Sequence, residues 1–134
     1  MSVREDVAAW LQIAYDDYDS ALFLFENKHP KPLEIICYHC QQAVEKSLKA
    51  FLCANDMEIQ KTHDAGLLCQ RCAELDNRFM NFLELCDEMV VYATHTRYPV
   101  RIEIEEYNAS KALQQALAIY NFISGTMAGN QSDP

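Results

Sequence analysis

The stretch from Leu33 to Cys53 constrains the fold of this chain more than any other. On a helix of about 3.6 residues per turn, its side chains separate into two faces. The packing face carries Ile36, Cys37, Cys40, Val44, Ser47, Leu48 and Phe51. The polar face carries His39, Gln41, Gln42, Glu45, Lys46 and Lys49. We therefore expect a helix that packs by its first face and leaves the second free for chemistry.

Four side chains of the polar face share a stripe about one helical turn wide: His39, Gln42, Lys46 and Lys49. Two ammonium groups, an imidazole and an amide in one stripe can bind phosphate. Charged helix faces are more often simply solvated, so both interpretations stay open. Glu45 and Lys49 also form an i,i+4 pair in the favourable order, which stabilises an exposed helix by only ~0.3–0.5 kcal/mol. That pair needs no function to explain it.

The composition and periodicity of the rest of the chain are those of a helical protein. Half of the 134 residues are hydrophobic, and only three glycines and four prolines are present, too few for the many turns of a sheet-rich fold. Helical spacing of apolar residues predicts segments at about 3–26, 33–55, 62–75, 76–93 and 103–124. The sequence therefore predicts an all-α fold, an antiparallel up-and-down four-helix bundle with one additional short helix.

We expect one domain over residues 1–124 and a disordered tail over 125–134, where the chain is small and polar. Ser2, Thr62 and Asp76 are the predicted N-caps of the first, third and fourth helices. The fourth helix carries more apolar residues than one bundle seam needs, since Met80, Leu85 and Val91 add to its regular stripe. This excess predicts a self-association surface, most simply that of a homodimer.

The charge of the chain limits its partners. Twenty acidic residues against eleven basic ones give a formal net charge of -9, which opposes nonspecific binding to nucleic acid or to an anionic membrane. The N-terminus does not resemble a signal peptide, and no apolar run approaches the ~20 residues of a membrane span. We expect a cytoplasmic protein whose six cysteines stay reduced.

Two C-x-x-C pairs, Cys37/Cys40 and Cys69/Cys72, have a spacing found in zinc sites. Zinc knuckles, however, lie in tight turns, whereas both pairs here continue a helical pattern. Reduced cysteine often packs as a small buried hydrophobe. We expect these cysteines in the core, with no metal and no cofactor, and keep zinc binding as the alternative.

Two short segments are further candidates for anion binding. In the segment 94–99, Arg97 offers a rigid fork of donors for phosphate and Tyr98 a ring for stacking, although the arginine could instead cap helix-end carbonyls. In the segment 61–64, Lys61 and His63 stand beside the free N–H groups of a helix start. Plain helix capping explains this second segment equally well.

The run HCQQAVEKSLKA at residues 39–50, followed by KTHD at 61–64 and TRYP at 96–99, resembles the HEPN domain, the family named for nucleotide binding in higher eukaryotes and prokaryotes. The resemblance covers roughly residues 7–123. It implies a helical bundle, often dimeric, and no metal. It also implies a nucleotide or other phosphate-bearing ligand, and a protein partner of the minimal nucleotidyltransferase type that accompanies this family in toxin–antitoxin pairs.

The same resemblance offers a test for catalysis. Many HEPN toxins are metal-independent ribonucleases with an arginine followed, after four to six residues, by a histidine, and no arginine of this chain has a histidine at that distance. A reversed pair, His95 and Arg97, leaves a ribonuclease with a rearranged motif as one alternative, and a dimeric scaffold without a small ligand as another. We favour a binding module, with the following ligand contacts converging on one site: Lys46, Lys49, His63, Arg97 and Tyr98.

Overall fold

The computed structural model describes residues 2–94 and 103–131. Over these ranges the chain forms helices and no strand, which confirms the all-α prediction. The elements are α1 (Val3–Asn27), α2 (Leu33–Ala54), α3 (Ala65–Leu75), the 3-10 helix η1 (Asn77–Phe82), α4 (Leu83–Thr94) and α5 (Glu106–Gln131). None of the described helices has both the length and the apolar character needed to cross a bilayer.

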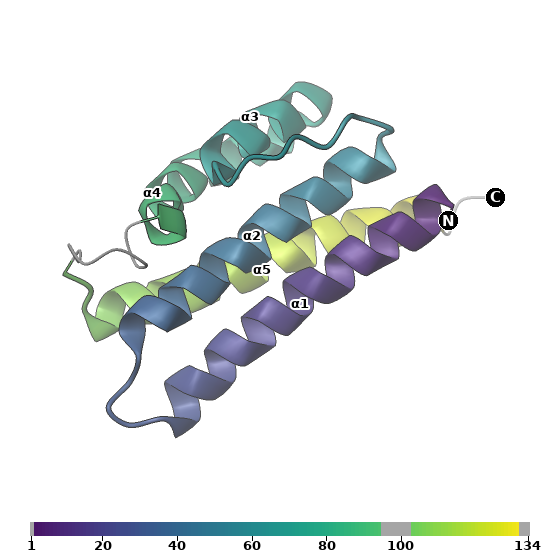
Figure 1. Ribbon diagram of the computed structural model, residues 1–134. Helices are drawn as coiled ribbons and strands as arrows, with labels where there is room; N and C mark the ends of the chain where they lie inside the picture. Colours follow the sequence, from purple (N-terminus) through teal and green to yellow (C-terminus); the bar gives the residue numbers. More distant parts are fainter. Residues whose placement is uncertain (1, 95–102, 132–134) are drawn as a thin grey trace.

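Helix α2 is the central element of the bundle. The three long helices α1, α2 and α5 all contact one another, and the shorter α3 and α4 lie on the side of α2 away from α1 (Figure 1). The start of α1 and the end of α5 lie at the same end of this group of three helices. Because α2 packs against α1, α3, α4 and α5, it is enclosed on more than one side.

The core follows from this central position. Thirteen of the 22 residues of α2 are buried. The aromatic ring of Phe79, from η1, lies between those of Phe51 and Phe122, with centroid separations of 4.6 and 5.2 Å. Such tilted and edge-on ring pairs stabilise a core beyond the area they bury. This cluster joins the central helix to η1 and to α5.

The predicted caps at Ser2 and Asp76 are confirmed. The Ser2 hydroxyl accepts a hydrogen bond from the backbone N–H of Glu5 at 3.1 Å. The Asp76 carboxylate accepts one from the backbone N–H of Arg78 at 3.0 Å. The helix that Asp76 begins is η1, and α4 follows at Leu83, so the predicted single fourth helix is divided in two.

The predicted cap at Thr62 is wrong. Helix α3 begins at Ala65, and its N-cap is Asp64, which accepts from the backbone N–H of Leu67 at 3.0 Å. The Thr62 hydroxyl instead accepts from the backbone N–H of Asp64 at 3.1 Å, a local turn that precedes the helix. Aspartate caps at least as well as threonine, so the helix starts at the later residue.

The predicted end of the last helix, at Ser124, is also wrong. Helix α5 continues to Gln131, so residues 125–131 are helical where a disordered tail was predicted. Met127 is buried one turn after Ile123, so the packing stripe extends beyond Gly125. The Thr126 hydroxyl donates to the Phe122 carbonyl four residues earlier, at 2.9 Å, within the same helix. Burial thus outweighs the low helix propensity of one glycine.

Candidate functional site: a buried carboxylate on the central helix

The side chain of Glu45 is fully buried in the middle of α2, and its carboxylate contacts the side chains of two lysines and a histidine. The ammonium groups of Lys46 and Lys49 each donate to its Oε2 atom at 3.0 Å. Nδ1 of His63 lies 2.9 Å from its Oε1 atom. The carboxylate is therefore the centre of an ionic cluster rather than one end of a surface pair.

Two glutamines of α2 extend this arrangement. The Gln41 amide nitrogen donates to the His63 carbonyl at 3.1 Å and, at 3.4 Å, to Oε1 of Glu45. The Gln42 amide nitrogen donates to the Gln41 amide oxygen at 2.8 Å, and its own amide oxygen accepts from Lys46 at 3.2 Å. Together these six side chains form what we call the Glu45 cluster: Gln41, Gln42, Glu45, Lys46, Lys49 and His63.

The fold brings the cluster together from two segments. Gln41, Glu45 and Lys49 are four residues apart and so lie in one column along α2. The chain leaves α2 and folds back along it before α3 begins (Figure 1), which returns His63 to a carboxylate 18 residues earlier. The Asp64 cap then fixes the point at which the backbone turns into α3. The position of His63 thus depends on the start of α3.

The polar face of α2 is not the free face that its sequence predicts. Gln41, Glu45 and Lys49 are all buried, so the prediction of an exposed i,i+4 pair is wrong. The two-face interpretation fails because helices pack against α2 on more than one side. On the side of α1, the Trp10 ring lies 5.7 Å from the ammonium of Lys49. Polar groups in such a position are retained only when they are paired, as these are.

The cluster keeps its carboxylate ionised. Burial raises the pKa of Glu45, but the hydrogen bonds from His63, Lys49 and Lys46 outweigh burial and lower the pKa below its usual range. Two ammonium groups and one carboxylate leave an excess of one positive charge, and protonation of His63 would add another. Lys49 is almost inaccessible, while the side chains of Lys46 and His63 are 19% and 69% exposed. The outer edge of the cluster is therefore cationic.

The contact with Glu45 also sets the hydrogen-bonding roles of His63. An ionised carboxylate only accepts hydrogen bonds, so Nδ1 of His63 must carry a proton and donate. In the neutral imidazole Nε2 is then an acceptor, and in the imidazolium it becomes a second donor. When the exposed imidazole ring is protonated, it can therefore bind an anion.

The structure brings three of the five predicted contact residues together: Lys46, Lys49 and His63 all bind one carboxylate. Arg97 and Tyr98 lie outside the described residues, as does His95, so the convergence of all five on one site stays a prediction.

The fourth member of the predicted stripe, His39, does not join the cluster. Its Nδ1 atom lies 3.0 Å from Asp17 of α1. Sequence reasoning missed the central role of Glu45, and the available signal was the column of polar residues at positions 41, 45 and 49.

The four cysteines of the C-x-x-C pairs are fully buried, which confirms that they pack in the core. Burial raises the pKa of the Cys37 thiol to about 11, and it also raises the pKa values of the Cys40 and Cys72 thiols. In the part of the chain that the structure describes, no group of three or more His, Cys, Asp or Glu side chains is arranged to hold a metal ion.

The fold and the site thus define the class of this domain: an all-α bundle with a buried ionic cluster on its central helix. The family model for the HEPN domain matches residues 7–126. The chain therefore belongs to the HEPN domain family.

A solved structure shares this fold. The crystal structure of ST0689, described as an archaeal HEPN homologue, matches with a TM-score of 0.69 and 23% sequence identity, over 90% of this chain and 96% of that one. Among proteins with curated descriptions, none matches.

Proposed function

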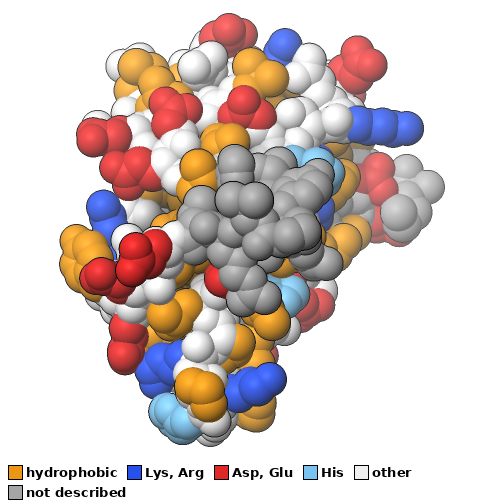
Figure 2. All heavy atoms as spheres, turned by 60° about the vertical axis from the view of Figure 1, so that its left-hand side comes forward, with side chains coloured by type: hydrophobic (Ala, Val, Ile, Leu, Met, Phe, Trp, Pro, Cys, Tyr) orange, Lys and Arg blue, Asp and Glu red, His pale blue; other side chains and the backbone are white. Residues whose placement is uncertain are grey.

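We propose that this protein is a binding module for a nucleotide or another phosphate-bearing ligand, which binds at the outer edge of the Glu45 cluster. The observation that carries the proposal is the local excess of positive charge in a protein whose net charge is -9. Figure 2 shows acidic side chains spread over one face of the molecule rather than gathered in one patch. Against that background, an anion would favour a cationic site whose donors are already ordered.

The two lysines and the histidine of the cluster differ in burial, and so in the part that each plays. Lys49 is buried and bound to Glu45, so it acts on a ligand through its charge rather than by contact. Lys46 and His63 reach the surface and provide the direct contacts. Glu45 holds both in place, which lowers the conformational entropy that ligand binding would otherwise cost. Buried ion pairs often add little to the stability of a protein, so we assign this one the role of ordering Lys46 and His63.

The finer parts of the proposal rest on the family. We propose that the module acts with a minimal nucleotidyltransferase as its protein partner, in the manner of a toxin–antitoxin pair. Resemblance to the family supports this partnership, and co-purification of the two proteins would test it.

A ligand screen by thermal unfolding tests the binding site. The candidates are AMP, GMP, ribose 5-phosphate and inorganic phosphate. A ligand at about 100 times its Kd stabilises the folded state by about 2.7 kcal/mol, which raises Tm by several degrees in a domain of this size. Lys46→Gln should weaken binding. Lys111→Gln is the matched control, because Lys111 is an exposed lysine of α5 paired with Glu88.

Two results would overturn the proposal. One is that no phosphate-bearing compound raises the Tm of the wild-type protein. The other is that Lys46→Gln and Lys111→Gln bind the ligand equally well, since the cluster would then have no part in recognition.

We also propose that a second copy of this chain binds the surface formed by η1 and α4. Two large apolar side chains support this idea, since Met80 of η1 is 52% exposed and Val91 of α4 is 40% exposed. Met80→Lys should convert a dimer to a monomer in light scattering. Phe23→Lys, at an exposed apolar residue of α1, should leave the dimer intact. A monomeric wild-type protein would refute this second proposal.

A further inference from the structure

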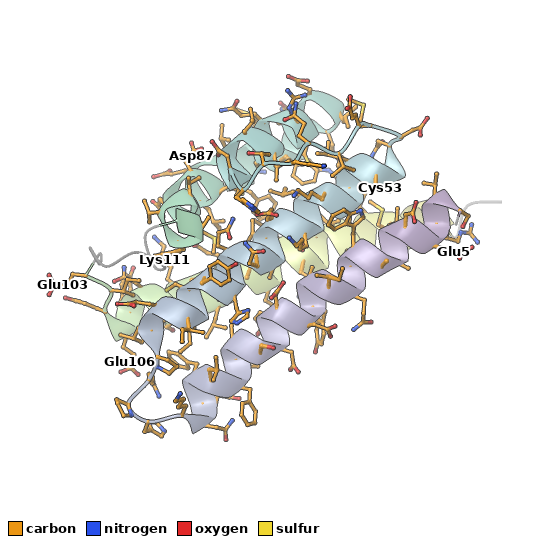
Figure 3. All side chains as sticks on the ribbon, in the orientation of Figure 1. Glu5, Cys53, Asp87, Glu103, Glu106 and Lys111 are labelled. Atoms are coloured by element: carbon orange, nitrogen blue, oxygen red, sulfur yellow. The ribbon has the colours of Figure 1, made fainter. Side chains whose placement is uncertain are left out.

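An apolar hollow adjoins the Glu45 cluster. Its volume is about 350 Å³, and α1 contributes four of its six lining residues. The lining residues are Asp6, Ala9, Trp10, Ile13, Cys53 and Ile59. Figure 3 shows Cys53 near the end of α2, beside the first turns of α1. A volume at the lower end of the ~300–1,000 Å³ range of ligand sites suits a small molecule or one part of a larger one.

Lys49 connects the hollow to the cluster. Its ammonium lies 5.7 Å from the centroid of the Trp10 ring and 3.0 Å from the Glu45 carboxylate. Glu45, Lys49 and Cys53 are spaced by four residues, so cluster and hollow are consecutive along one column of α2, with a rise of about 6 Å per step. The segment after α2 contributes to both, with Ile59 at the hollow and His63 at the cluster. The apolar hollow and the cationic cluster are therefore neighbours, joined by the contact between Lys49 and Trp10.

We propose that the hollow holds the base of a nucleotide, stacked on the Trp10 ring, while the phosphate of the same nucleotide binds Lys46 and His63. This inference rests on the proposed function and adds a base subsite to it. The hollow and the cluster match the two halves of a nucleotide, a flat apolar ring and an anionic group. Asp6, at the hollow, repels phosphate and accepts hydrogen bonds from the N–H groups of a base. It therefore favours this orientation over the reverse one.

The chain carries its own reporters of the subsite. Trp10 is the single tryptophan of the sequence, so a base stacked on it changes the whole tryptophan fluorescence. Cys53 is the one cysteine of the six that is not buried, and the structure describes all six. A base in the hollow would cover its thiol and slow its alkylation. Burial raises the pKa of this thiol, as do the nearby charges of Asp6 and Asp56, so alkylation is best compared at one mildly alkaline pH.

The experiment compares GMP and AMP with ribose 5-phosphate, which carries the phosphate but no base, and with guanosine, which carries the base but no phosphate. We expect GMP or AMP to quench Trp10 fluorescence and protect Cys53, and ribose 5-phosphate to bind more weakly and do neither. Stacking on an aromatic ring strengthens binding roughly 5- to 150-fold per base. Trp10→Leu should remove this gain in affinity for nucleotides and leave the affinity for ribose 5-phosphate unchanged. Unchanged binding of ribose 5-phosphate also shows that the variant is folded. Phe23→Leu, at an exposed aromatic residue of the same helix, should change neither affinity.

The outcomes separate the two proposals. Equal affinity for GMP and ribose 5-phosphate, with constant fluorescence, would overturn the base subsite and leave the phosphate site standing. If guanosine bound as tightly as GMP and Lys46→Gln left this binding unaffected, the base subsite would stand and the phosphate site would be overturned. Failure of all four compounds to bind would overturn both.

Discussion

Replacement of Glu45 by glutamine tests whether the cluster is a buried ionic site. The amide has nearly the shape of the carboxylate but no charge, so the ammonium of Lys49 would remain buried without a counter-ion. Removing one partner of a buried ion pair costs about 3–5 kcal/mol, because the remaining charge is left uncompensated. Glu45 binds two ammonium groups and one imidazole, which places the expected loss within that range rather than below it.

This loss is large relative to the whole stability of a domain, which is typically about 5–15 kcal/mol. In a chain of this length, 1 kcal/mol corresponds to roughly 3–5 °C, so Tm should fall by roughly 9–25 °C. Urea unfolding followed by circular dichroism gives the free energy directly.

The matched control is Glu88→Gln. Glu88 also pairs with a lysine, Lys111, at 3.4 Å, but the two side chains are 50% and 42% exposed, respectively. Exposed pairs contribute about 0–1 kcal/mol, so this variant should unfold close to the wild type. A double variant, Glu45→Leu with Lys49→Met, should recover part of the stability lost in Glu45→Gln, because it removes both charges together. If Glu45→Gln lost no more stability than Glu88→Gln, the argument for a buried ionic cluster would be refuted.

One pH comparison and two further variants test the structure by urea unfolding. The pKa of Glu45 is lowered in the folded state, so its stabilising effect is present above the ordinary carboxyl pKa and is lost as pH falls through the folded-state pKa. The difference in unfolding free energy between wild type and Glu45→Gln should therefore shrink in acid. A difference that stays constant with pH would contradict the ionic interpretation. Asp64→Ala removes the cap of α3 and should cost about 1 kcal/mol, whereas an unchanged stability would show that the cap is dispensable. Phe79→Ala empties the centre of the aromatic cluster and should cost about 3–5 kcal/mol; a loss below 1 kcal/mol would contradict its placement in the core.

The fold class was predictable because helical periodicity is strong in every long segment of this chain. The cap at Ser2 was predictable too, since a serine followed three residues later by a glutamate is a local signal. Local signals failed where burial decided the result. Met127 extends α5 through a contact that the small, polar sequence around it does not reveal.

The candidate site was only half predictable. The residues Lys46, Lys49 and His63 follow from their chemistry, but their common partner does not. A two-face interpretation of α2 assumes that one side packs and the other meets water, and this assumption holds for a helix at the edge of a bundle. Glu45 lies on a helix that is enclosed on more than one side, and its partner His63 comes from a segment 18 residues later. Only the three-dimensional path of the chain brings the two together.

The burial of the cluster separates its effects on folding from its effects on binding. Glu45 and Lys49 lie in the core, so their substitution should change stability first. Lys46 and His63 reach the surface, and substituting either should change ligand affinity with a smaller effect on stability. Because the core carboxylate holds the surface donors, Glu45→Gln should weaken binding even at temperatures where the variant is fully folded. A ligand that binds Lys46 and His63 would in turn stabilise the same helix on which the core is built, which is why thermal unfolding is a direct measurement of this site.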